Sequence, residues 1–210
     1  MKQIFLLVAI LTSALGIKAQ EMERPLSFIP AHTAGRIGYR TLLEIPFFDD
    51  FSSGRGVIHS PETNRWISSG VYTSHQMPIS PLTLGVAVFD GLNAQGMPYD
   101  FTDPFAQGAA DTLTSMPLNL ASLDSVDNVY LFFYLQAAGN GNMPDDVDSM
   151  YIDFYSPITG EWSQVKSISS DNTTNWIRHD IHIKQGQYLQ SGFSFRFRND
   201  ATLSGAYDQW

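Results

Sequence analysis

The sequence predicts an antiparallel β-sandwich, and three features of the chain indicate this fold class. Many short apolar segments are separated by stretches rich in Gly, Pro, Asn, Asp and Ser. One of them, residues 193–198, alternates strictly between phenylalanine and a polar residue, as a strand with one buried face does. No segment shows a convincing amphipathic helical period, so we expect strands joined by turns to form the core.

The strands are predicted in order from these apolar segments. The first, residues 45–51, reads IPFFDDF and ends in paired aspartates. Pro117 cannot donate a ladder hydrogen bond, so its strand should be interrupted at an edge or a bulge. A turn at residues 156–162 contains Pro, Thr and Gly. The other predicted strands are residues 66–73, 84–90, 110–120, 129–136, 148–155, 165–168, 176–183 and 193–198.

The chain is expected to be organised around a hairpin formed by residues 129–136 and 148–155. A loop rich in Gly, Asn, Pro and Asp separates the two segments. In the first segment the odd-numbered residues are apolar, and Tyr130, Phe132 and Tyr134 occupy the opposite face. Because both faces are apolar, this strand is predicted to lie centrally in a sheet, with material on both sides.

Composition and charge narrow the class of protein. The chain has 210 residues, of which 43% are hydrophobic and 13% aromatic, enough for one sizeable domain with a large core. The net charge of −9 argues against nucleic acid as a partner, because phosphate binding needs a basic surface. It also argues against electrostatic attraction to anionic lipid and is compatible with divalent cations.

Residues 1–20 have the pattern of a secretory signal peptide. Lys2 precedes the apolar run IFLLVAIL, which is too short to span a membrane, and small residues follow it. Residues 21–44 are an irregular lead-in, and residues 45–210 form the predicted sandwich domain. No later segment is long and apolar enough for a transmembrane helix, so the protein is expected to be secreted or held at the outer cell surface. The chain has no cysteine, which excludes thiolate metal sites.

Six ordered segments resemble a known family. They read FFDDFS, LGVAVFDGLNAQGMPY, ADTLTSMPLNL, YLFFYLQAAGNGN, DSMYIDFYSPITGEW and FRFRNDATLSGAYDQW. Together they resemble the N-terminal jelly-roll module of large secreted Bacteroidetes proteins exported by the type IX secretion system. That module is similar to MAM domains and, more distantly, to concanavalin A-like sandwiches. The resemblance covers residues 45–210. It implies that the module's last strand, which would follow Trp210 and pair near residues 45–51, is missing from this chain.

The same resemblance implies a structural calcium ion between the first and last strands. Asp49, Asp50 and Asp208 match the positions of its ligands, and oxygen-only ligands suit Ca²⁺. The alternative interpretation is that these three are solvated turn aspartates. Three further aspartates of the predicted hairpin loop are expected to form a solvated loop tip: Asp145, Asp146 and Asp148.

Aromatic side chains in a loop provide a second candidate site. Tyr99 and Phe101 lie in a turn-rich stretch, where strand packing explains a large apolar group less easily. Such rings could bind sugars by stacking. Packing within the loop is the alternative.

The sequence contains no recognisable catalytic motif. No glutamate pattern places two carboxylates on one strand as a retaining glycosidase requires, and H-E-x-x-H and G-x-S-x-G are absent. The sequence therefore predicts a non-catalytic module for adhesion, glycan binding or scaffolding, with glycans or cell-surface proteins as partners. The alternatives are a glycosidase-like hydrolase on the same fold and a purely structural spacer.

Overall fold

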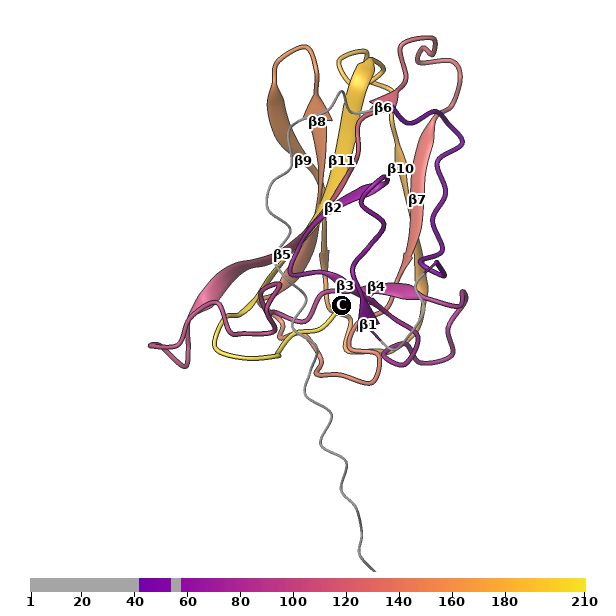
Figure 1. The fold of residues 1–210 in the computed structure, drawn as a ribbon. Helices are drawn as coiled ribbons and strands as arrows, with labels where there is room; N and C mark the ends of the chain where they lie inside the picture. Colours follow the sequence, from indigo (N-terminus) through magenta and orange to yellow (C-terminus); the bar gives the residue numbers. More distant parts are fainter. Residues whose placement is uncertain (1–41, 54–57) are drawn as a thin grey trace, which may run out of the picture. The chain divides into compact units, whose positions relative to one another are not determined.

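The computed structural model of the protein describes residues 42–53 and 58–210. The predicted signal peptide and the predicted lead-in up to residue 41 lie outside the described residues. Within them the chain forms eleven β-strands and no helix, which confirms the predicted all-β class. Figure 1 shows β1 (Ile58–His59), β2 (Trp66–Ser69), β3 (Tyr72–Ser74), β4 (Val86–Val88), β5 (Gln107–Ser115), β6 (Leu118–Asn119), β7 (Tyr130–Leu135), β8 (Ser149–Ser156), β9 (Glu161–Ser169), β10 (Ile177–His182) and β11 (Ser191–Thr202).

A large antiparallel sheet has the strand order β2-β5-β11-β8-β9. β6 also pairs with β11, and the residues between β5 and β6 include Pro117, so the predicted interruption is confirmed. The predicted turn at residues 156–162 joins β8 to β9, with Ser156 opposite Glu161. Gly160 has a φ of +73°, a conformation that glycine adopts without strain. β11 is the central strand of the large sheet, because it pairs with β5, β6 and β8.

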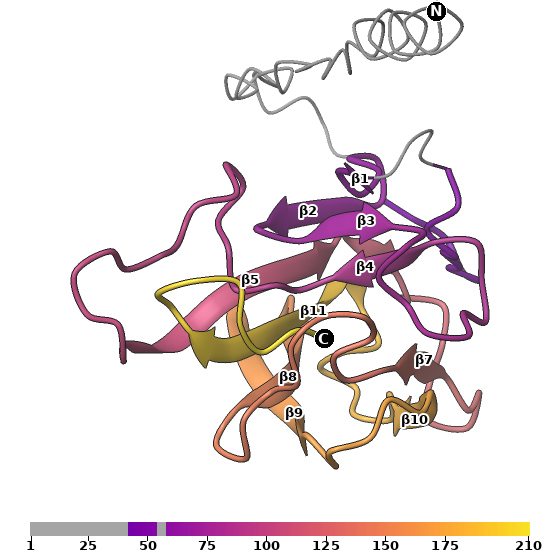
Figure 2. The same ribbon diagram turned by 90° about the horizontal axis from the view of Figure 1, so that it is seen from below.

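A second layer of strands packs against one face of the large sheet (Figures 1 and 2). It consists of two separate antiparallel units, the order β1-β3-β4 and the pair β7-β10. The Phe133 ring on β7 meets the Phe197 ring on β11 edge-on, with ring centroids 4.9 Å apart. The protein is thus an antiparallel β-sandwich, as predicted. The fully buried core side chains include Leu113, Met150, Ile152, Phe154 and Phe193.

The predicted hairpin of residues 129–136 and 148–155 is wrong. β7 pairs with β10, whereas β8 pairs with β9 and β11. The loop after β7 carries the chain from one layer to the other, and β7 is not a central strand. The face of β7 that carries Tyr130, Phe132 and Tyr134 is exposed, because no described strand covers it.

Residues 45–51 form no strand, contrary to the sequence prediction. Asp49 Oδ1 accepts a hydrogen bond from the Phe51 amide, which closes a tight turn and bends the chain. Asp49 Oδ2 accepts a hydrogen bond from the Trp66 indole at 2.7 Å. The rings of Phe47 and Phe51 both pack on Trp66. Side chains, rather than a backbone ladder, therefore hold this segment to the sandwich.

Candidate functional site

The outer face of the β7–β10 pair presents a row of three aromatic side chains. Tyr130, Phe132 and Tyr134 alternate along β7, and their exposed fractions are 51%, 54% and 47%. Every second side chain of a strand lies on one face, about 7 Å from the next. The intervening residues of β7 pack against the core. β7 is thus anchored through one face and offers the aromatic row on the other.

A polar row runs beside the aromatic row on the neighbouring strand. The register of β10 on β7 places three polar residues opposite the rings, in the pairs Arg178–Tyr134, Asp180–Phe132 and His182–Tyr130. The Arg178 guanidinium donates to Asp180 at 2.8 Å and lies 5.1 Å from the centre of the Phe132 ring. The His182 ring stacks on Tyr130, with centroids 4.5 Å apart. We call these six residues the β7–β10 face.

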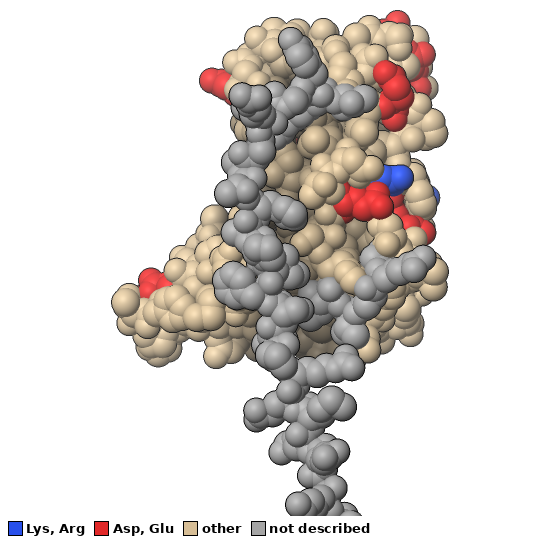
Figure 3. All heavy atoms as spheres, in the orientation of Figure 1, with Lys and Arg blue, Asp and Glu red and all other residues tan. Residues whose placement is uncertain are grey.

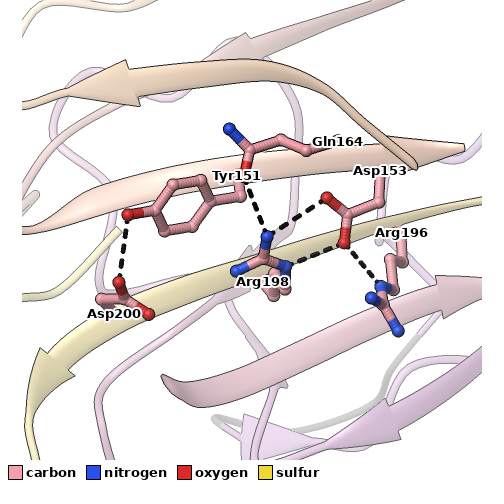
Figure 4. A network of polar contacts seen from close by, with 6 residues as sticks. All are labelled: Tyr151, Asp153, Gln164, Arg196, Arg198 and Asp200. Atoms are coloured by element: carbon pink, nitrogen blue, oxygen red, sulfur yellow. Dashed lines mark hydrogen bonds and ion pairs between the residues drawn. The ribbon is translucent and has the colours of Figure 1, made fainter. Parts of the chain in front are cut away.

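The outer face of the large sheet carries a polar network of a different kind (Figure 4). Asp153 on β8 is buried and accepts hydrogen bonds from Nε of Arg196 and Nε of Arg198, both at 2.8 Å. Arg198 also covers the ring of Tyr151 at 4.3 Å. Because the two guanidinium groups share one carboxylate and cover their neighbouring rings, we assign this network a structural role. Both arginine side chains are partly exposed.

The two aromatic residues that the sequence predicts as ligand contacts lie in different environments. Tyr99 is half-buried, and its hydroxyl donates to Oδ1 of the buried Asp111 at 2.9 Å. The amides of Asp90 and Gly91 donate to Oδ2 of Asp111, whose pKa burial raises to about 6. Phe101 is 70% exposed. Tyr99 therefore anchors its loop to the sheet, whereas the ring of Phe101 is largely exposed.

Three carboxylates meet where the chain enters β8. One oxygen each of Asp145, Asp148 and Asp208 lies within 4.8 Å of the others. Asp208 Oδ1 accepts a hydrogen bond from the Asp145 amide at 3.2 Å, and its Oδ2 accepts one from the Thr202 amide at 2.7 Å. Asp148 is 2% exposed, and its Oδ2 has no hydrogen-bond partner among the described residues. We call this group the acidic triad.

The electrostatics of the acidic triad favour a cation. Burial, together with the negative charges of Asp208 and Asp145, raises the pKa of Asp148 to about 6. In the described part of the chain, no Lys or Arg forms an ion pair with the triad. A divalent cation would offset the repulsion, and carboxylate oxygens are the ligands that hard cations prefer. The triad can therefore hold a metal ion.

The structure brings only one of the predicted metal ligands to this group. Asp208 belongs to the triad, whereas Asp49 and Asp50 accept hydrogen bonds from their own neighbours and from Trp66. The expectation of a solvated loop tip is wrong for Asp148, which is buried. One feature of the sequence could have indicated this burial. Asp148 directly precedes a buried strand, where a loop residue has little contact with solvent.

No protein-family model and no curated protein matches this chain. In the part of the chain that the structure describes, no helix is long and apolar enough to cross a membrane. Figure 3 shows one face of the molecule, on which acidic side chains are scattered and basic ones are few. Because no family model or curated protein matches, a function has to be inferred from the β7–β10 face and the acidic triad.

Proposed function

We propose that the protein is a non-catalytic module that binds glycans through the β7–β10 face. The observation that carries this proposal is the row of three half-exposed rings beside a row of charged and polar side chains. Aromatic rings offer flat apolar surfaces on which the CH face of a sugar can stack. A few polar side chains beside them fix the orientation of the ligand by hydrogen bonds to its hydroxyl groups.

The geometry of the face favours an extended, uncharged oligosaccharide. From Tyr130 to Tyr134 the row spans about 13 Å at the rise of a β-strand. A ligand that contacts all three rings must therefore be longer than a single sugar. The net charge of −9 disfavours acidic polysaccharides, because like charges repel over the distances at which ligands approach.

Removing one ring of the row should weaken glycan binding without unfolding the protein. We expect Phe132→Ala and Tyr134→Ala each to lower the affinity about 5- to 10-fold, because a lost aromatic contact is worth about 1 kcal/mol. A glycan array identifies the best neutral oligosaccharide, and isothermal titration calorimetry then measures the variants. Phe105→Ala is the matched control, since Phe105 is 86% exposed but lies outside the β7–β10 face.

Two results would contradict glycan binding by a non-catalytic module. If the protein binds no glycan on the array, the face does not serve this role and a structural spacer becomes the better interpretation. If the bound oligosaccharide is cleaved, and new reducing ends accumulate with time, the protein is a hydrolase instead. Equal loss of affinity in Phe105→Ala would show that the β7–β10 face is not the binding surface.

We also propose that the acidic triad binds a structural calcium ion. The support is its three oxygen ligands, the buried and unpartnered Oδ2 of Asp148, and the absence of a basic partner among the described residues. The ion would fasten the segment that carries Asp208 to the loop that carries Asp145 and Asp148. Asp208 is common to this site and to the site predicted from the sequence, and Asp145 and Asp148 take the place of Asp49 and Asp50.

Calcium should stabilise the folded protein. A ligand at about 100 times its Kd adds about 2.7 kcal/mol to the free energy of unfolding, so we expect the melting temperature to rise by several degrees relative to chelator. Asp148→Asn and Asp208→Asn should remove this rise. Asp146→Asn is the matched control, because Asp146 lies in the same loop but outside the triad. No calcium response in a cooperatively unfolding protein would rule out the site.

We infer that the module acts outside the cytoplasm, as part of a larger secreted or cell-surface protein. The support is the signal-peptide pattern of residues 1–20 and the resemblance to secreted jelly-roll modules. Glycan binding suits this setting, because a module of this kind can hold its parent protein at a cell surface or on a polysaccharide.

A further inference from the structure

Aromatic and basic side chains gather on the outer face of the large sheet. They come from β9, β8 and β11, which are neighbours in the sheet. The register of these strands places Trp162 opposite Tyr155 and Arg198 opposite Tyr151. We call this group the β8–β11 face, and its five members are Tyr151, Tyr155, Trp162, Arg196 and Arg198.

The β8–β11 face lies on the side of the sheet away from the core. Phe195 and Phe197 alternate with the two arginines along β11 and pack into the core, so the arginines occupy the opposite face. The side chains of Arg196 and Arg198 are 29% and 26% exposed. The three aromatic residues of the face are also partly exposed. A partner can therefore reach both kinds of side chain.

Arg196 is held in place before any partner binds. Its guanidinium carbon lies 4.4 Å from the centre of the Trp162 ring, and that ring lies 5.4 Å from the ring of Tyr155. Its Nε donates to the buried Asp153 at 2.8 Å. Because an arginine that is both stacked and hydrogen-bonded has already lost side-chain freedom, a contact with it costs little further conformational entropy.

Arg196 also keeps hydrogen-bond donors for a partner. Nε is its only nitrogen that donates to a described residue, so its two Nη groups have no acceptor among those residues. Asp153 balances one of the two positive charges that it binds. Asp200, a second carboxylate, accepts from the Tyr151 hydroxyl beyond Arg198. The surplus of positive charge therefore lies at the end of the face that carries Arg196 and Trp162.

We propose that the β8–β11 face docks a partner protein through an exposed carboxylate of that partner. The carboxylate accepts hydrogen bonds from the Nη groups of Arg196, and an apolar side chain beside it packs on Trp162. Tryptophan, tyrosine and arginine are the residues that dominate the binding energy of protein–protein interfaces. The carboxylate follows from charge complementarity with the guanidinium group. This docking is independent of glycan binding, because the β7–β10 face belongs to the other layer.

A protein surface fits these observations better than a small molecule or a nucleic acid. Small ligands bind in concave sites that bury most of their surface. The two cavities described above β4 and β7 and between β9 and β10 are lined by residues other than these five. The net charge of −9 disfavours nucleic acid. A sheet face with stacked aromatic and arginine side chains instead matches the surface of another protein.

Fluorescence anisotropy with a labelled peptide tests the proposal. The probe is a nine-residue peptide of alternating Glu and Leu. When it is extended, its carboxylates recur about every 7 Å, which is also the spacing of alternate residues such as Arg196 and Arg198 on β11. We expect saturable binding that weakens as salt is added. A Gln/Leu peptide of equal length should bind at least tenfold more weakly, because its amides cannot form charge-assisted hydrogen bonds of equal strength.

Variants of Arg196 test which residue receives the carboxylate. Arg196→Gln should weaken binding of the Glu/Leu peptide at least tenfold. Arg196→Lys keeps the charge but lacks the planar fork, and it should weaken binding at least threefold. Lys184→Gln is the matched control, because it removes an exposed positive charge outside the face and should change binding less than twofold. Chemical denaturation verifies that each variant is folded.

Three results of these titrations would overturn the proposal. The first is the absence of saturable binding of the Glu/Leu peptide. The second is equal binding of the Glu/Leu and Gln/Leu peptides. The third is an equal loss of affinity in Lys184→Gln and Arg196→Gln, which would show that the peptide responds to the overall charge and not to the β8–β11 face.

The indole N–H signals of the four tryptophans localise the peptide by NMR. The signal of Trp162, assigned through Trp162→Phe, should shift on titration. The signals of the buried Trp66 and Trp210, and that of Trp176 in the other part of the fold, should stay in place. A shift of Trp176 without Trp162 would show that the peptide binds elsewhere. If the Trp162 signal changes with protein concentration alone, and Arg196→Gln abolishes this change, the face pairs two copies of the chain and the proposed partner is wrong.

Discussion

At the scale of single residues, Asp148 links the acidic triad to pH. Its pKa is raised from 3.8 to about 6 in the folded protein, mainly by burial. The folded state without metal therefore favours the protonated carboxyl group. The stability that the protonated Asp148 gives to the metal-free protein is fully present below about pH 4 and is lost as the pH rises through about 6. Calcium has the opposite requirement, because it binds the ionised carboxylate.

The calcium response and the metal-free stability should therefore change with pH in opposite directions. Between about pH 5 and about pH 7 the calcium-induced rise in melting temperature should grow, because protons compete less with the ion. In chelator, this carboxyl group should make the protein less stable at the higher pH. Differential scanning calorimetry at both pH values, with and without calcium, measures the two effects.

A second buried carboxyl group supplies the control. The pKa of Asp111 is also raised to about 6 by burial, and Asp111 lies outside the triad. Asp148→Asn should therefore reduce the pH dependence of stability in chelator without abolishing it, and Asp111→Asn should leave the calcium response intact. A calcium response of equal size at both pH values would contradict the link to Asp148.

At the scale of elements, the network around Asp153 fastens β8 to β11 on the outer face of the large sheet. Asp153→Ala removes the carboxylate that Arg196 and Arg198 share. Breaking a fully buried ion pair costs about 3–5 kcal/mol, and we expect about 2 kcal/mol here because both arginines are partly exposed. Chemical denaturation measures this loss in the free energy of unfolding.

Asp200 offers a matched control on β11, the strand that carries the two arginines. It accepts one hydrogen bond from the Tyr151 hydroxyl, at 3.0 Å, and belongs to none of the described ion pairs. Asp200→Ala should cost about 1 kcal/mol or less, the net value of a typical hydrogen bond. If both substitutions cost the same, the two arginines do not depend on Asp153 and the network does not fasten the strands.

At the scale of the whole molecule, local patterns in the sequence predicted the positions of strands better than they predicted which strands pair. The Phe/polar alternation of residues 193–198 predicted a correct strand, and the residues before Glu161 predicted a correct turn, because the information for both is local. The stretch around Phe132 is apolar on both faces, so its pattern cannot distinguish a central strand from an edge strand with an exposed aromatic row. The partner of β7 lies more than forty residues further along the chain.

The candidate sites were also predictable only in part, because they are formed by residues that lie far apart in the sequence. Asp208 was predicted as a metal ligand, but its neighbours Asp145 and Asp148 lie some sixty residues earlier, and only the tertiary fold brings them together. The β7–β10 face was not predicted, because it required knowing that no other strand covers β7. Tyr99 was predicted as a ligand contact, but its hydroxyl bonds to Asp111, a residue on another element.

The position of β11 has a consequence for how the protein folds. It is the last strand described along the chain, yet it lies at the centre of the large sheet and pairs with β5, β6 and β8. During synthesis the earlier strands emerge without the strand that joins them, so their edges stay open until residues 191–202 have been made. Such non-local pairing slows folding and prolongs exposure to aggregation.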